Sequence, residues 1–197
     1  MSVEAWRTVP TLVGRHVTLR PLDRADRPAL LAAFSGLAQV FATAVPNPVT
    51  IDDWFDTLVA QQAAGRVLPF TLLDADGQVA GATRLLRTSP GCHRAEIGGT
   101  LYARRVQRTA LSTEMKRLLL GHGFDRLGCQ CVQLRANWRN SASRLAIERL
   151  GARGEAVLRW HSVSGNGEVS DTVVYSILAD EWPEVRRNLD YLLERPQ

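Results

Sequence analysis

The residues whose types and spacing could do chemistry gather at one predicted strand-to-helix junction. Small, hydroxyl-bearing and polar residues dominate this junction, which comprises Gln107, Arg108, Thr109, Ala110, Leu111, Ser112 and Thr113. The first N–H groups of a helix have no intrahelical acceptor, and the helix dipole makes that end partly positive. An anion such as a diphosphate would be stabilised there. From the residues alone, an ordinary helix cap is the more common explanation of this pattern.

Charged residues close to the junction add to its chemistry. Arg104, Arg105 and Arg108 are suited to phosphate oxygens. The strand predicted before the junction, over residues 94–102, carries one acid, Glu96. A carboxylate there could act as a general base or hold a water molecule. The alternatives are that Glu96 faces solvent or pairs with an arginine.

Other catalytic arrangements cannot be recognised in the sequence. No Cys–His or Ser–His–Asp pattern supports a covalent intermediate. Cys129 and Cys131 lack the second Cys/His pair of a zinc site, and core packing explains them better. None of the four histidines stands at metal-ligand spacing. We therefore expect no metal and no acyl-enzyme.

The order of the elements around the junction predicts a mixed α+β fold. Apolar patterns predict strands over residues 16–20, 67–73, 79–86, 94–102, 131–135, 156–161 and 172–178. They predict helices after Asp23, from Thr50 to residue 63, and over residues 111–126, 141–150 and 180–193. Asp23 and the Thr50–Asp53 pair are the expected helix caps. Early antiparallel strands and a later β-α-β crossover predict one mixed, mostly antiparallel sheet of about seven strands with helices on both faces.

Length and composition predict one domain over residues 1–197, with a core at about 12–183 and a C-terminal helix at about 180–194. No apolar run is long enough to span a membrane, and the N-terminus has no signal-peptide pattern, so we expect a cytoplasmic protein. The net charge is +4, and the arginines are spread along the chain. Nucleic-acid binding is therefore only weakly motivated. A homodimer is a candidate assembly because symmetric pairs are the commonest oligomers.

The junction resembles the diphosphate-binding signature of the GNAT superfamily of acyl-CoA N-acetyltransferases. The superfamily pattern Gln/Arg-x-x-Gly-x-Gly/Ala falls on residues 107–112, with Ala110 and Ser112 at the two small-residue positions. Residues 12–22, 140–144, 148–152, 156–159 and 171–176 resemble the RimJ/RimL-like branch, whose named members acetylate protein N-termini. The resemblance covers residues 12–183.

The resemblance implies that acetyl-CoA gives its acetyl group directly to a neutral amine. Residues 107–113 would bind the diphosphate, and main-chain N–H groups from Leu101 and Tyr102 to Arg104 would polarise the thioester carbonyl. Asn140 would contact the pantetheine arm, or only cap its helix. Ser143 would orient or protonate the thiolate, since Ile147 replaces the usual tyrosine acid. Without the resemblance, Ser143 is an ordinary surface residue.

The amine acceptor is open at this stage. A protein α-amine needs little basic catalysis, because its pKa is far lower than that of lysine. It is therefore the leading acceptor. A small-molecule amine such as an aminoglycoside or polyamine would favour an acidic cluster, for which Asp52, Asp53 and Asp56 are the candidates. A non-catalytic acyl-CoA-binding module and an RNA-associated protein are the remaining alternatives.

Overall fold

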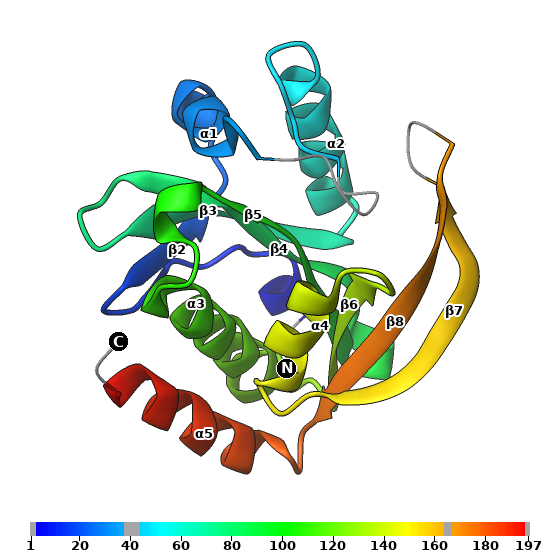
Figure 1. Ribbon diagram of the computed structural model, residues 1–197. Helices are drawn as coiled ribbons and strands as arrows, with labels where there is room; N and C mark the ends of the chain where they lie inside the picture. Colours follow the sequence, from blue (N-terminus) through cyan, green and yellow to red (C-terminus); the bar gives the residue numbers. More distant parts are fainter. Residues whose placement is uncertain (1–2, 38–43, 164–166, 196–197) are drawn as a thin grey trace.

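The computed structural model describes residues 3–37, 44–163 and 167–195, and its centre is a twisted sheet with helices on both faces (Figure 1). The strands are β1 (Leu12–Val13), β2 (Val17–Pro21), β3 (Val67–Asp74), β4 (Val79–Ser89), β5 (Arg94–Tyr102), β6 (Cys131–Asn137), β7 (Arg153–Val163) and β8 (Val169–Leu178). The α-helices are α1 (Arg27–Phe34), α2 (Ile51–Ala63), α3 (Ala110–Gly121), α4 (Ser141–Glu148) and α5 (Trp182–Glu194). The described residues also contain four 3₁₀ turns, which are η1 (Val3–Trp6), η2 (Arg24–Asp26), η3 (Pro90–Cys92) and η4 (Arg104–Val106). They contain one π-helical turn, η5 (His122–Arg126).

The strand order is β1-β2-β3-β4-β5-β6-β8-β7, and β5 and β6 form the parallel pair. All other neighbours run antiparallel. The predicted mixed, mostly antiparallel sheet with a β-α-β crossover is therefore confirmed. The described residues contain eight strands instead of about seven, because the two-residue β1 pairs with β2. A strand that short gives no alternating pattern to detect.

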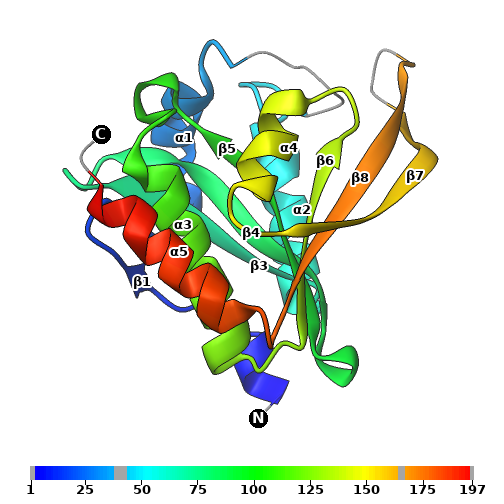
Figure 2. The same ribbon diagram turned by 60° about the horizontal axis from the view of Figure 1, so that its bottom comes forward.

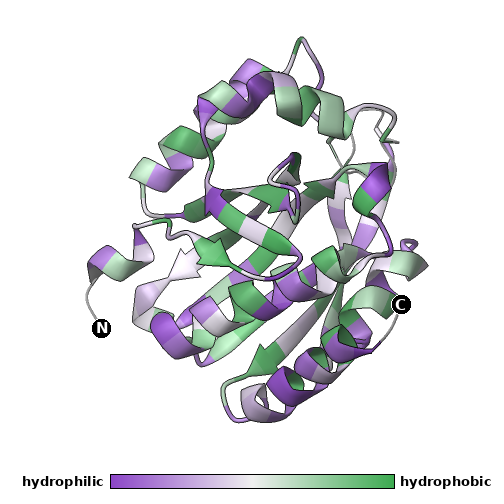
Figure 3. Cartoon of the chain, turned by 90° about the vertical axis from the view of Figure 1, so that its left-hand side faces the viewer, coloured by the Kyte–Doolittle hydropathy of each residue, from purple (hydrophilic) through white to green (hydrophobic). Residues whose placement is uncertain are grey.

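The helices divide between the two faces of the sheet. Helices α1 and α2 cover one face, and α3, α4 and α5 cover the other (Figures 1 and 2). Polar and apolar residues are interspersed along the helices, while much of the sheet is apolar (Figure 3). Such helices bury one side and expose the other. Among the described residues, no helix is long and apolar enough to cross a membrane.

Two helix starts and one helix end differ from expectation. Asp23 caps the 3₁₀ turn η2 that precedes α1, by accepting from Ala25 N–H at 2.9 Å. Thr50 makes no side-chain cap for α2; the Asn47 side chain instead accepts from the Val49 and Thr50 N–H groups. The helix expected over residues 111–126 changes to π geometry at His122. Local side-chain hydrogen bonds of this kind compete closely, so sequence spacing does not choose among them.

Helices α3 and α5 lie side by side and form one packed unit (Figure 2). Arg117 of α3 pairs with Asp190 at 2.7 Å and lies over the ring of Trp182. That ring is buried and stacks on Phe124. The C-terminal helix therefore fixes the position of α3, whose first turn contains the predicted anion site.

Candidate active site

The parallel pairing of β5 and β6 ends partway along both strands. Their register runs from Arg94 opposite Cys131 to Ile97 opposite Leu134, whereas β5 continues to Tyr102 and β6 to Asn137. Beyond Ile97, the edge of β5 that faces β6 has no strand partner within the part of the chain that the structure describes. Main-chain donors and acceptors on this edge are therefore available to an extended ligand.

Gly99 follows the end of this pairing and permits a bulge in β5. Its φ is +59°, and the β4–β5 register shifts between Ala82 and Arg84. A Cβ atom at residue 99 would lie 2.1 Å from Arg84 Nε. Both observations favour glycine there. The bulge thus places the Arg84 guanidinium against the main chain of β5 at the point where pairing with β6 stops.

One main-chain donor of β5 points to the unpaired edge. The Ala103 N–H donates to the Ala80 carbonyl at 2.8 Å, toward β4. Hydrogen-bonded and non-bonded pairs alternate along an antiparallel ladder. The Tyr102 N–H is therefore directed away from β4, whereas Leu101 and Ala103 point toward it. Of the main-chain donors predicted in this strand, Tyr102 is the one aimed at the open side.

The junction after β5 is a tight turn capped by Thr109. The Thr109 hydroxyl donates to the Val106 carbonyl at 2.8 Å and accepts from the Leu111 N–H at 3.3 Å. Arg108 has a φ of +62°, which is uncommon for a residue with a side chain. Gln107 Nε2 donates to the Tyr102 carbonyl at 3.4 Å, which ties the turn to the end of β5. The turn fixes the first amides of α3 in place.

The junction lies at the molecular surface. Gln107, Arg108 and Thr109 are exposed, Ser112 and Thr113 are half-buried, and Ala110 and Leu111 are buried. A hollow of about 530 Å³ opens beside the turn, on the side of the α5 C-terminus. Arg105 pairs with Asp74 and donates to the Val79 carbonyl, while Arg104 and Arg108 remain exposed. Two of the three predicted arginines are thus accessible to an anion.

Tyr102 connects β5 to the first turn of α3 through Ser112. Burial raises the pKa of the Tyr102 hydroxyl, and a hydrogen bond with Ser112 offsets this only in part. A phenol with a raised pKa stays protonated at neutral pH. The sequence indicated a main-chain contact alone for Tyr102 and no role for its side chain.

Helix α4 begins just beyond the end of β6 and lies on the same face of the sheet as α3 (Figures 1 and 2). Asn140 Oδ1 accepts from the Ser143 N–H at 3.0 Å, so this side chain caps α4. Ser143 is half-buried, and Ile147 is buried on the same helix. Arg144 anchors the helix by stacking over Trp138 and donating to the Tyr175 hydroxyl at 3.2 Å. The structure thus places Asn140 and Ser143 together on the first turn of α4.

Glu96 is buried and paired with arginines. Its Oε2 lies 2.6 Å from Arg87 Nη1 and 3.0 Å from Arg135 Nε. Only 5% of its side chain is exposed. Of the alternatives stated for Glu96, pairing with an arginine is therefore the one the structure contains. The ion pairs hold the carboxylate one residue before the end of the β5–β6 pairing.

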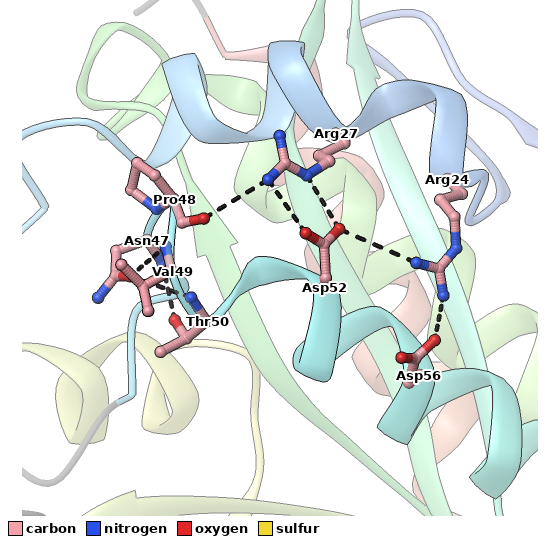
Figure 4. A network of polar contacts seen from close by, with 8 residues as sticks. All are labelled: Arg24, Arg27, Asn47, Pro48, Val49, Thr50, Asp52 and Asp56. Atoms are coloured by element: carbon pink, nitrogen blue, oxygen red, sulfur yellow. Dashed lines mark hydrogen bonds and ion pairs between the residues drawn. The ribbon is translucent and has the colours of Figure 1, made fainter.

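The acidic cluster considered for cationic acceptors is neutralised. Asp52 lies 2.9 Å from Arg27 Nε, and Arg24 pairs with Asp56 (Figure 4). These ion pairs join η2 and α1 to α2. Asp53 alone has no arginine partner among the described residues. Asp52 and Asp56 therefore offer no free carboxylate to the cationic amine that this cluster was predicted to bind.

The sequence predicted no role for three cationic side chains, which are Arg84, Arg135 and Lys116. Arg84 and Arg135 lie within predicted strands, and an arginine within the apolar run of a central strand is itself a signal. Lys116, the only lysine, is half-buried in α3, and burial lowers its pKa to about 8. No described residue pairs with its ammonium group. Within the same residues, no three His, Cys, Asp or Glu side chains gather as metal ligands would.

Comparisons with known proteins agree on one family. A model of the acetyltransferase (GNAT) domain matches residues 16–153. A protein from T. thermophilus assigned as an acetyltransferase is 30% identical, with a TM-score of 0.83 over 94% of this chain and 98% of that one. A GCN5-related N-acetyltransferase from Brucella melitensis is 29% identical, with a TM-score of 0.84 over 94% of this chain and 86% of that one.

A third structure, Mycobacterium smegmatis RimJ in complex with CoA-disulfide, is 22% identical, with a TM-score of 0.74 over 95% of this chain and 96% of that one. At this identity the similarity concerns the fold. No curated protein matches the sequence significantly.

Proposed function

The chain belongs to the GNAT acetyltransferase family, and we propose that it moves the acetyl group of acetyl-CoA directly onto the α-amino group of a protein or peptide. The observation that carries this proposal is the end of β5–β6 pairing at Ile97 and Leu134, beside the capped start of α3. An extended thioester can bind one edge of β5 while its diphosphate meets the α3 amides. We propose that all 197 residues serve this one domain.

The residues of the junction fit a diphosphate. Ala110 and Ser112 have short side chains, so a phosphate can approach the main chain of the first turn. The left-handed conformation of Arg108 is a local strain of the kind found at binding sites. Its exposed guanidinium, together with that of Arg104, would neutralise phosphate charge. Asn140 would meet the pantetheine arm through its amide NH₂ group, because its Oδ1 is used in the cap.

The transfer step needs few protein groups. The amine nitrogen attacks the thioester carbonyl carbon, the C–S bond breaks as the C–N bond forms, and one amine proton is lost. The Tyr102 N–H would stabilise the negative charge that develops on the carbonyl oxygen. Ser143 would supply a proton to the departing thiolate. Glu96, which Arg87 and Arg135 hold in place near the end of the β5–β6 pairing, would position the water molecule that carries the amine proton away.

The proposed site offers only a weak base, and this favours an α-amine as the acceptor. At pH 7 roughly one α-amine in six is neutral, against fewer than about one lysine in a thousand. A site whose candidate base, Glu96, is engaged by two arginines suits the α-amine. A polyamine or aminoglycoside is the weaker candidate, because arginines already neutralise Asp52 and Asp56.

The test is acetyl-CoA turnover against a panel of amines. We expect amine-dependent CoA release, with mass spectrometry showing one added acetyl group at the N-terminus of peptides. Spermidine and an aminoglycoside serve as the competing acceptors. Tight CoA binding without turnover on any amine would instead identify a non-catalytic acyl-CoA-binding module. Faster turnover of spermidine than of peptides would contradict the proposed acceptor.

A further inference from the structure

Three arginines lie around Glu96, a buried carboxylate on the face of the sheet that α1 and α2 share. Leu86 of β4 and Gln133 of β6 both stand opposite Glu96. Arg84 and Arg135 are two residues away from these partners on the same strands. Since side chains alternate between faces, both arginines share the face of Glu96. Arg87 joins them through its ion pair with Glu96.

The single negative charge of Glu96 does not neutralise the positive charge of the three arginines. Arg87 and Arg135 both approach the same oxygen of Glu96. Three guanidinium groups around one carboxylate leave two positive charges uncompensated. The neighbouring Arg94 adds nothing to the excess, because Gln133 links it to Glu155 in a separate hydrogen-bonded chain.

Two of the arginines lack the hydrogen bonds that buried guanidinium groups require. Arg84 is half-buried, and burial lowers its pKa while the charge of Glu96 opposes that effect. No described residue accepts a hydrogen bond from Arg84. Arg135 Nε lies 3.0 Å from Glu96, yet it is a buried nitrogen without a properly directed acceptor. Buried donors without acceptors are costly, so an acceptor supplied by a ligand would be stabilising.

Arg84 lies against the same strand that would hold the acetyl group. Arg84 contacts the bulge at Gly99, two residues beyond the last β5–β6 pair. The proposed thioester position, at the Tyr102 N–H, is three residues further along the same strand. A primary amine attacking that thioester would bring its neighbouring substituents close to Arg84.

We propose that Arg84 and Arg135 bind a carboxylate of the acceptor, so that the preferred acceptor is a primary amine with a carboxylate close to it. This inference rests on the proposed acetyl transfer and specifies its substrate class. The carboxylate can come from the α-carboxyl group of a free amino acid or from an acidic side chain next to a peptide N-terminus. The same two positive charges would repel polyamines and aminoglycosides.

Matched acceptor pairs test the proposal on the wild-type protein. Serine is compared with serinamide, and a Ser-Glu peptide amide with its Ser-Gln counterpart. We expect kcat/KM to favour the carboxylate member of one pair by about tenfold or more, the size of a charge-assisted hydrogen bond. The pair that shows the preference identifies the source of the carboxylate. Equal rates within both pairs, or faster turnover of spermidine, would overturn the proposal while leaving acetyl transfer intact.

Arginine variants test which side chains produce the preference for a carboxylate-bearing acceptor. Arg84→Gln should reduce the preference ratio to near one, and Arg84→Lys should restore part of it. Arg94→Gln is the matched control, because it removes a charge from the same strand region without touching Glu96. An unchanged ratio in Arg84→Gln and Arg135→Gln would contradict the assignment. If a variant fails to fold, the wild-type pairs still decide.

A binding measurement tests the carboxylate site independently of the proposed acetyl transfer. Calorimetry in the presence of CoA compares N-acetylserine with N-acetylserinamide, and the N-acetylated Ser-Glu and Ser-Gln peptide amides with each other. We expect one carboxylate probe to bind about tenfold more tightly than its amide. This measurement needs no turnover, so it stands even if no amine is acetylated. Equal affinities within both pairs would refute the carboxylate site.

Discussion

The carboxylate of Glu114 in α3 accepts a hydrogen bond from the Val17 N–H at 3.0 Å, across 97 residues of sequence. The same carboxylate accepts from the Arg15 and His16 N–H groups at 2.9 and 2.5 Å. One buried acid thus joins the helix that starts at the junction to the edge of the sheet. Its carboxylate satisfies three backbone donors that have few alternatives.

Replacing Glu114 should therefore destabilise the protein. In Glu114→Ala these N–H groups lose their acceptor, and we expect the free energy of unfolding to fall by about 3 kcal/mol. Urea denaturation measures the change. Glu184→Ala, at an exposed position in α5, is the control and should stay within about 0.5 kcal/mol of wild type. A small effect at Glu114 would mean that water replaces the carboxylate.

Arg108 should show opposite effects on stability and cofactor binding. Arg108→Gly relieves the strain of φ +62° and should stabilise the fold by about 1 kcal/mol. The same change removes a phosphate partner, so the Kd for CoA should rise about tenfold. Arg108→Ala is the matched variant, since it removes the charge and keeps the strain. Thermal melts and calorimetry give both readouts; unchanged CoA affinity in both variants would remove Arg108 from the diphosphate site.

Ser143 should affect turnover without affecting CoA binding. If its hydroxyl protonates the departing thiolate, Ser143→Ala should lower kcat about tenfold or more and leave the Kd for CoA unchanged. Ser141→Ala is the control, because Ser141 is an exposed residue at the start of the same helix. Equal kcat values for the two variants would show that another group, or water, supplies the proton.

Lys116 should react as an unusually acidic ammonium group. Burial lowers its pKa to about 8, and the neutral amine is the form that reacts with acylating reagents. The folded protein should therefore show reaction at Lys116 that rises with pH through about 8. At pH 9 its neutral fraction should be roughly twenty times that of an ordinary lysine.

Mass spectrometry measures this reaction, because the tryptic peptide of the single lysine is unique. Protein unfolded in urea is the control and should have its midpoint near the ordinary pKa of about 10.4. A folded midpoint at that ordinary value would show that solvent reaches the ammonium group freely.

The sequence by itself determined the order of the elements and the place of the junction between β5 and α3. Strand alternation and the small residues from Thr109 to Ser112 are properties of neighbours in the chain. Local backbone geometry depends mainly on such neighbours, so these features could be read from residues 94–113 and their surroundings. The family resemblance then supplied the chemistry of acetyl transfer.

Only the tertiary structure decided how the charges are partnered. Asp52 resembled a free acid in the sequence, but Arg27 neutralises it from another helix. Glu96 resembled a base, but Arg87 and Arg135 reach it from neighbouring strands, while Arg84 has no such partner among the residues that the structure describes. These contacts depend on sheet register and on the bulge at Gly99. Charge pairing is set by distances between residues far apart in the chain, which no local pattern encodes.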